Sequence, residues 1–154
     1  MKTNQLAQVA LLLWVVTVAV LVWYLMRNRT AEDTDGRAAI TLHPAERQVV
    51  LSEMHGLLVA AQGIMSGASR GDKMHIMAAA HAGGMASMSQ ADPALMAKLP
   101  LEYKALNMNV HHEMDEIAKA AGDGRPTAEL LQMASDTMAK CVACHAEWRL
   151  RTSK

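Results

Sequence analysis

The sequence predicts an all-α protein, in which a single membrane-spanning helix precedes an antiparallel four-helix bundle. Three observations predict this fold class. Residues 6–26 contain no charged side chain, four later segments repeat apolar residues every three or four positions, and no stretch alternates with period two for long enough to form a strand. Helices of similar length joined by short connections favour antiparallel packing in a bundle.

Length and composition restrict the classes of protein to consider. A chain of 154 residues holds one domain and an appendage. Its 15 lysines and arginines balance 15 aspartates and glutamates, so the composition predicts no nucleic acid or other polyanionic partner. Two cysteines only three positions apart exclude a disulfide framework. Phenylalanine is absent and methionine occurs 13 times, so methionine is expected to fill much of the core.

The apolar run at residues 6–26 has the length of a transmembrane helix. Its 21 residues extend about 31 Å at 1.5 Å per residue, against about 30 Å of bilayer hydrocarbon. A cleaved signal peptide would have an apolar region of about 7 to 15 residues and a cleavage site of small residues, whereas Arg27 and Arg29 follow here. We therefore expect an uncleaved single-pass anchor. Lys2 on one side and Arg27 and Arg29 on the other do not settle its orientation, and the haem motif described below is what predicts residues 1–5 on the cytoplasmic side.

The segment after the anchor is expected to be a linker, with helices beginning beyond it. Residues 27–42 are polar and show no sustained periodicity. The first helix of the bundle is expected to open at Pro44 and to close at Gly71, and the second to cover residues 73–89 with a weak point at Gly83 and Gly84.

The last two helices are also delimited by proline and glycine. A short turn of helix is expected around residues 95–98, and the third helix follows Pro100 and ends at Gly122. The fourth opens at Pro126, and its apolar spacing continues to Trp148. Residues 43–154 are thus predicted to form the folded domain.

The chemistry lies in the motif Cys-Val-Ala-Cys-His at residues 141–145, which is the attachment sequence of haem c. On a helix, Cys141, Cys144 and His145 fall within roughly 60° of one another. Two thiols on one face can form thioethers with the vinyl groups of a haem, and the adjacent imidazole can bind the iron. A thioredoxin-like dithiol would need a βαβ setting, and a zinc site would need more ligands. We therefore expect one covalently attached haem c.

Haem c also predicts where the domain lies. Thioether attachment of haem takes place in the exported compartment. The bundle is therefore expected in the periplasm, held at the bacterial inner membrane by residues 6–26.

The carboxyl end of the chain resembles that of class II c-type cytochromes, the cytochrome c′ and cytochrome c-556 families. In those families the last helix ends in C-x-x-C-H-x-x-aromatic-Arg, and here Trp148 and Arg149 follow the motif. The resemblance covers roughly residues 43–151. It implies a four-helix bundle with the haem near one end and Trp148 beside it. Arg47 and Gln48 also resemble the family's Arg-Gln pair, which implies that Arg47 approaches a haem propionate.

The resemblance leaves the second axial ligand of the iron open. Four residues after Arg47, where low-spin members have methionine and high-spin members an apolar residue, this chain has Leu51. The strict register predicts five-coordinate iron with an apolar distal face. Met54, one turn further on, is the alternative ligand, and a second histidine is a third option. His111 is expected to be hydrogen-bonded at a helix seam rather than to bind iron, and His112 to be exposed.

These features predict a one-electron carrier and not an enzyme, with membrane-bound or periplasmic redox proteins as partners. A methionine ligand suits electron transfer, whereas an open site can bind nitric oxide or carbon monoxide, so a gas-binding protein is the alternative. A peroxidase would need a distal base, which the sequence does not offer. Because family members pair through their first two helices, a homodimer is one expected state.

Overall fold

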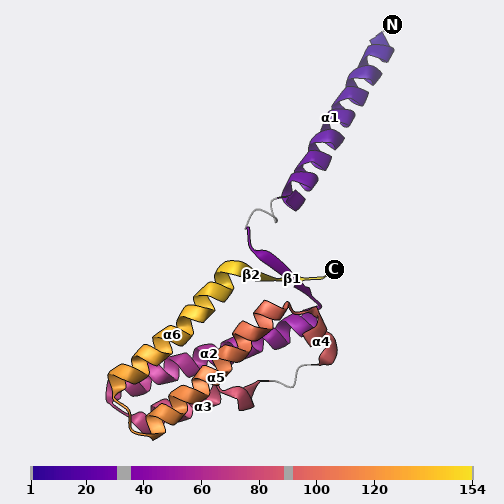
Figure 1. Cartoon of the computed structure of the whole chain (residues 1–154). Coiled ribbons are helices and arrows are strands. Elements are labelled where there is room, and N and C mark those ends of the chain that lie inside the picture. The colour runs from indigo at the N-terminus through magenta and orange to yellow at the C-terminus, as the bar shows by residue number, and fades with distance from the viewer. Residues whose placement is uncertain (1, 31–35, 89–91, 154) are drawn as a thin grey trace. The chain divides into compact units, whose positions relative to one another are not determined.

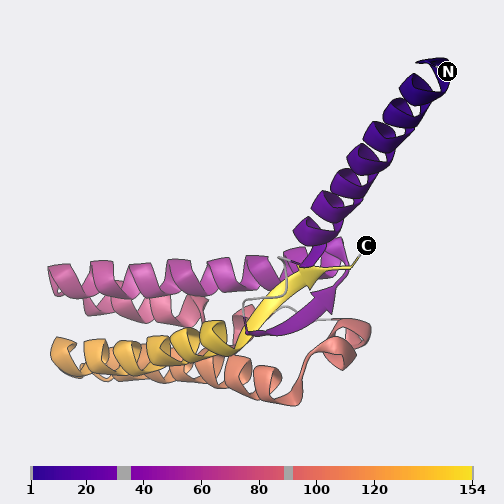
Figure 2. The same cartoon turned by 90° about the horizontal axis from the view of Figure 1, so that it is seen from above.

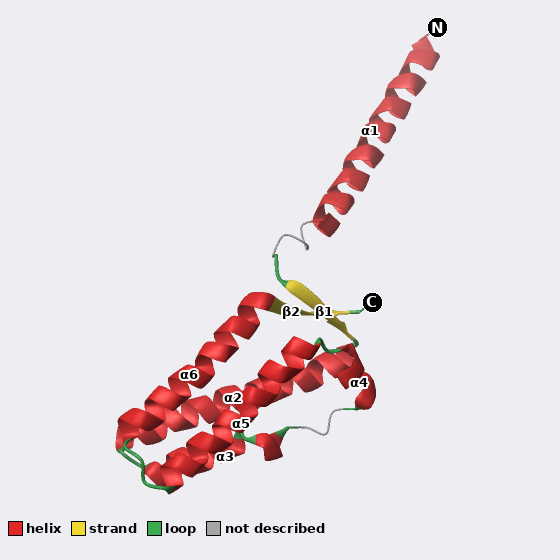
Figure 3. Ribbon diagram, viewed as in Figure 1, coloured by secondary structure: helices red, strands yellow, loops and turns green. Residues whose placement is uncertain are grey.

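The computed structural model describes residues 2–30, 36–88 and 92–153. It is mostly helical, at 80%, with six helices and a small two-stranded parallel sheet (Figure 1, Figure 3). The chain divides into two compact units, Met1–Gly36 and Arg37–Lys154. The predicted all-α class is therefore correct for most of the chain and incomplete at the sheet.

The first unit contains one long helix, α1 (Lys2–Thr30). Its stretch Ala7–Trp23 is apolar on all sides, and large side chains such as Leu13 and Trp14 are about two-thirds exposed, at 65% and 66%. A helix that is hydrophobic all round needs an apolar environment. The predicted ends of the span at residues 6 and 24–26 lie outside the described side chains.

The second unit begins its helical part with α2 (Pro44–Arg70), close to the predicted bounds. The carboxylate of Glu46 accepts the N–H of His43 at 2.9 Å, and Gly71 ends the helix with a φ of 66°, where glycine is favoured. Among the described residues, α2 is the helix that passes a length and hydropathy test for a membrane span. Ile64 of this helix is fully buried against α3, whereas Leu58 and Val59 are exposed.

The next helix, α3 (Lys73–Ala82), is shorter than the predicted helix at residues 73–89. It stops at Gly83 and is followed by a single 3-10 turn, η2 (Met85–Ser87). Asp115 explains the break. Its carboxylate accepts a hydrogen bond from the N–H of Met85 at 2.9 Å, and its Oδ1 lies only 1.9 Å from the position of a Cβ built on Gly84.

Three further helices follow the predicted order. They are α4 (Pro93–Lys98), α5 (Leu101–Gly122) and α6 (Thr127–Glu147). Helix α3 packs between α2 and α5, and α6 packs on α5 and along part of α2 (Figure 2). The helical core between them contains Ile64, Ile76, Ala80, Met114, Ile117, Ala118, Ala121, Leu130 and Ala134.

Two strands lie where none was predicted. Strand β1 (Ala38–Leu42) pairs in parallel with β2 (Trp148–Thr152), in a register that runs from Ala38↔Trp148 to Leu42↔Thr152. The prediction that the chain has no strand is therefore wrong. Residues 38–42 are not part of a linker, and Trp148 does not belong to the last helix. The pairing of these short strands is supported by the burial of Ile40 and Leu42.

The sheet closes one end of the helices and covers a second, smaller core (Figure 1). We call this cluster the sheet-end core; its buried members are Ile40, Leu42, Val50, Leu95, Leu99 and Tyr103. Three predicted site residues, Met54, Cys144 and Trp148, pack against it. The strands therefore position the site as well as closing the fold.

Candidate functional site

The Cys-x-x-Cys-His motif occupies the last turns of α6. Cys141 and Cys144 are half-buried and His145 is exposed. The helix ends two residues later, where the N–H of Trp148 bonds to the carbonyl of Cys144 and the chain turns into β2. The motif thus combines helical spacing with an accessible imidazole.

Two adjoining cavities meet at this motif, and both are half open to solvent. Met54, Tyr103, Cys144 and His145 line both of them. The first, the strand-side cavity, is completed by Arg37, Arg47, Leu51, Trp148, Arg149 and Leu150. The second, the helix-side cavity, is completed by Leu57, Leu106, Asn107, Val110, Lys140 and Cys141. All seven residues expected at the site therefore lie around one continuous space.

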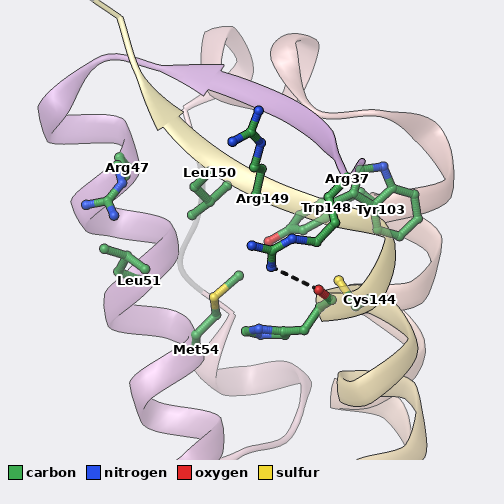
Figure 4. Close-up of a pocket in the computed structure, with 10 residues that line it drawn as sticks. Arg37, Arg47, Leu51, Met54, Tyr103, Cys144, Trp148, Arg149 and Leu150 are labelled. Atoms are coloured by element: carbon green, nitrogen blue, oxygen red, sulfur yellow. Dashed lines mark hydrogen bonds between the residues drawn. The ribbon is translucent and has the colours of Figure 1, made fainter. Parts of the chain in front are cut away.

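Helix α2 forms the wall that faces the motif. Arg47, Leu51 and Met54 follow one another along this helix, and the Met54 side chain extends toward the space in front of Cys144 (Figure 4). Leu51 lines the strand-side cavity, whereas Met54 lines both cavities, as His145 does. Both candidates for the distal position are present, and Met54 is the more central.

Arginines from both strands complete the strand-side cavity. Arg37, next to β1, donates a hydrogen bond from Nη1 to the main-chain oxygen of His145 at 3.1 Å (Figure 4). Arg149 of β2 and Arg47 of α2 line the same cavity. Three guanidinium groups thus give this side of the site a positive potential.

Two aromatic rings close the back of the site. Trp148 and Tyr103 pack edge to face, with centroids 6.0 Å apart and an interplanar angle of 85°. Burial raises the pKa of the Tyr103 hydroxyl, so this ring stays neutral.

Sequence reasoning missed Arg37, Tyr103, Arg149 and Leu150 as residues of the site. For β2 the signal was present, since Trp148 and Leu150 alternate with Arg149 and Arg151. For Arg37 no local pattern exists, because its partner His145 lies 108 positions away.

The environment of the two thiols does not fit a redox dithiol. Burial raises the pKa of both Cys141 and Cys144, and the neighbouring thiol and Glu147 raise that of Cys144 further. Reactive dithiols have a lowered thiol pKa instead. In the part of the chain that the structure describes, no group of three histidine, cysteine, aspartate or glutamate side chains is placed to hold a metal ion.

The donor set fits haem c. Two thiols and an imidazole share one turn of α6, a thioether faces them from α2, and the walls carry the apolar side chains of Leu51, Leu57, Leu106 and Val110. Guanidinium groups suit the two carboxylates of a haem, because they bind carboxylates through paired hydrogen bonds. The two cavities that His145 lines are half open to solvent.

The buried histidine lies outside this space. His111 is 1% exposed, and its two ring nitrogens bond to the oxygen of Gly83 at 2.8 Å and to Oε1 of Glu53 at 2.9 Å. The expectation of a hydrogen-bonded seam residue is confirmed, and so is the exposure of His112. With both nitrogens occupied, His111 is not available to iron.

No family model matches the chain, and no curated protein or solved structure matches it either. The function is therefore inferred from the residues and their geometry.

Proposed function

We propose that this protein is a membrane-anchored monohaem c-type cytochrome that carries single electrons. The observation that carries this proposal is the arrangement of Cys141, Cys144 and His145 on one turn of α6, facing a cavity with Met54 on its opposite wall. Bound haem c would supply reversible one-electron chemistry at its iron.

Each part of the site has a role in this proposal. Cys141 and Cys144 would hold the group covalently, and the imidazole of His145 would bind its iron. The thioether of Met54 would be a second ligand of the iron, and Leu51 beside it would exclude water from this wall of the site. Arg47, Arg37 and Arg149 neutralise the propionates and favour the reduced state of the site, since nearby positive charge stabilises a centre that gains an electron.

The architecture is proposed to be the four-helix bundle of class II cytochromes, formed by α2, α3, α5 and α6. The apolar helix at residues 6–26 would anchor it in a bacterial inner membrane, with the domain in the periplasm. An anchored carrier meets membrane-bound partners at a raised effective concentration, which suits exchange with membrane-bound redox proteins.

Leu51 supports a second candidate function. It lines the strand-side cavity one turn before Met54 and presents an apolar surface to the distal side. If Met54 does not bind the iron, bound haem c would offer an open position to a diatomic gas such as nitric oxide.

An optical experiment tests the proposal and separates these two functions. The full chain is produced in a host that matures haem c, and its spectrum is recorded oxidised, reduced, and reduced with carbon monoxide. A low-spin spectrum that carbon monoxide changes slowly is expected for an electron carrier. A high-spin spectrum that shifts at once would favour gas binding, and absence of covalent haem would contradict both.

A pair of methionine variants identifies the ligand. Met54→Ala should convert the low-spin spectrum to a high-spin one. The control is Met65→Ala, since Met65 is on the same helix, 38% exposed and outside both cavities. An unchanged spectrum in Met54→Ala would remove Met54 from the iron.

A further inference from the structure

A separate cavity lies between α2, α4 and α5, and we call it the α4 cavity. It measures about 180 Å³ and is more enclosed than the two cavities at the motif. Tyr103 lines it as well as both of those cavities, and Asn107 lines it and the helix-side cavity, so the α4 cavity shares two side chains with the proposed haem site. Neither Cys141 nor His145 borders it.

The α4 cavity has apolar walls and a few polar groups. Met88, Met96 and Met108 line it with aliphatic side chains such as Leu99. Methionine sulfur makes favourable contacts with aromatic rings and adapts to their shape. The polar side chains on its surface are Glu53, Lys104 and Asn107.

Glu53 is held rigidly by a buried network. Its Oε1 accepts hydrogen bonds from Nε2 of His111 at 2.9 Å and from Nδ2 of Asn107 at 3.0 Å. His111 bonds to the oxygen of Gly83 through its other nitrogen, so both ring nitrogens face acceptors and both carry hydrogen. Among the described residues, none donates a hydrogen bond to Oε2 of Glu53.

Glu53, held by two hydrogen bonds, is thus an acceptor on the wall of a largely apolar cavity. A ligand that places a hydroxyl group against Oε2 would make a hydrogen bond to a charged partner without reorganising the site. Lys104 adds a donor, because its ammonium group has three hydrogens and gives one to the carbonyl of Met96 at 3.2 Å. The cavity therefore suits a ligand with two polar ends on an apolar body.

The size of the cavity points to one aromatic ring. A cavity of about 150 Å³ in another protein takes up benzene, so about 180 Å³ admits a single substituted ring. A ring with two hydroxyl groups can donate to Glu53 and accept from Lys104 while its faces contact the methionines.

We propose that the α4 cavity binds a hydroquinone ring, with one hydroxyl on Oε2 of Glu53 and the methionine side chains on the ring faces. Binding of the ring stands on this cavity alone. The biological role that we assign to this binding is the recognition of reduced membrane quinone beside a haem c, and this role rests on the proposed function.

The test is a binding titration of the full chain in detergent micelles with methylhydroquinone, kept anaerobic and followed by NMR of ¹³C-labelled methionine methyl groups. Saturable shifts confined to a few methionines are expected. The probe's dimethyl ether, which has no hydroxyl donor, should bind about 10- to 100-fold more weakly, since it loses a hydrogen bond to a charged acceptor. Equal affinity for the ether, or shifts that reflect only partition into the micelle, would overturn the proposal.

Variants link the binding to the cavity. Glu53→Gln should weaken the binding of methylhydroquinone as much as replacing methylhydroquinone by its dimethyl ether does. The control Glu46→Gln, on the same helix but outside the cavity and paired with Lys98, should bind like the parent chain.

A second variant keeps the test decisive if Glu53→Gln does not fold. Met108 is 48% exposed and lines the cavity, so Met108→Trp should fill it without touching the Glu53–His111 pair and abolish binding. Unchanged binding in Met108→Trp would contradict the site. The titration is run on chain produced with haem maturation and on chain produced without it. If both preparations bind methylhydroquinone but neither carries covalent haem, the proposed function is rejected and the assignment of the α4 cavity stands.

Discussion

Arg37 donates a hydrogen bond to the main-chain oxygen of His145, 3.1 Å away, and so joins the start of the second unit to the end of α6. The same region is held by the pairing of β1 with β2 and by the N–H of Ser153, which bonds to the oxygen of Leu42 at 2.8 Å. Arg37 and strand β1 are therefore part of the candidate site.

Replacing Arg37 should loosen the end of the motif helix. A cation at a helix C-terminus contributes about 0.3 to 1 kcal/mol, so Arg37→Gln should speed hydrogen exchange of the Trp148 amide up to about fivefold. Lys119→Gln, which removes an exposed charge from α5, is the control and should leave this amide unchanged. Equal exchange in both variants would show that the hydrogen bond does not hold the helix end.

The Glu53–His111 pair should make stability depend on pH. Burial by itself lowers the pKa of His111, but the hydrogen bonds to Glu53 and Gly83 raise it above its usual 6.5. Burial raises the pKa of Glu53, and the hydrogen bonds from His111 and Asn107 bring it below 4.5. The contribution of His111 to the free energy of unfolding is complete below pH 6.5, and it is lost as the pH rises through the raised pKa of His111 in the folded state. The contribution of Glu53 is complete above pH 4.5, and it is lost as the pH falls through the lowered pKa of Glu53 in the folded state.

Chemical unfolding at a series of pH values measures this dependence. The pair should contribute most between about pH 4.5 and 6.5, and the double variant Glu53→Gln/His111→Gln should flatten both flanks. His111→Gln alone should lose about 3 kcal/mol, because it leaves a buried carboxylate without its charged partner. A parent profile as flat as that of the double variant would refute the charged pair.

Gly67 should not tolerate a side chain. A Cβ there would lie 2.8 Å from Cγ1 and 2.9 Å from the main-chain nitrogen of Ile76, so Gly67→Ala forces α2 and α3 apart at a cost of about 1 to 3 kcal/mol. Gly56→Ala is the control, since nothing lies within 4 Å of its Cβ position. It should stabilise the chain by up to about 1 kcal/mol through helix propensity. Urea unfolding distinguishes the two, and equal effects would mean that the helices are not in close contact at Gly67.

Leu42 should contribute to stability like a residue of a core. It is 1% exposed in the sheet-end core, so Leu42→Ala should lower the free energy of unfolding by about 2 to 5 kcal/mol. The same substitution in a linker would leave the free energy of unfolding almost unchanged. Thr41→Ala, an exposed change in the same strand, provides the comparison.

The sequence predicted the helices well because their ends carry local signals. Pro44, Gly71 and Gly122 each stand within a residue of an observed end. The end of α3 was predicted too far along because Asp115, on another helix, interrupts it at Gly84. The strands were missed because each has five residues and its partner is at the other end of the domain.

As with the helices and strands, the parts of the candidate site that carry local sequence signals could be predicted, and the parts that depend on distant segments could not. The spacing of Cys141, Cys144 and His145 is local, and it placed the chemistry on the last helix. Met54 and Leu51 came from the repeat along α2 and a family resemblance, and both line the space in front of the motif. Arg37 could not be predicted, because it reaches the motif only through the parallel pairing of β1 with β2.

The central claim is that Cys141 and Cys144 hold one haem through covalent bonds, and intact mass spectrometry under denaturing conditions tests it most directly. The full chain, produced in a host that matures haem c, should carry the mass of one haem after unfolding. The variant with both cysteines changed to serine should carry none. An unmodified mass for the parent chain, produced beside a known cytochrome that is fully loaded in the same cells, would contradict the account.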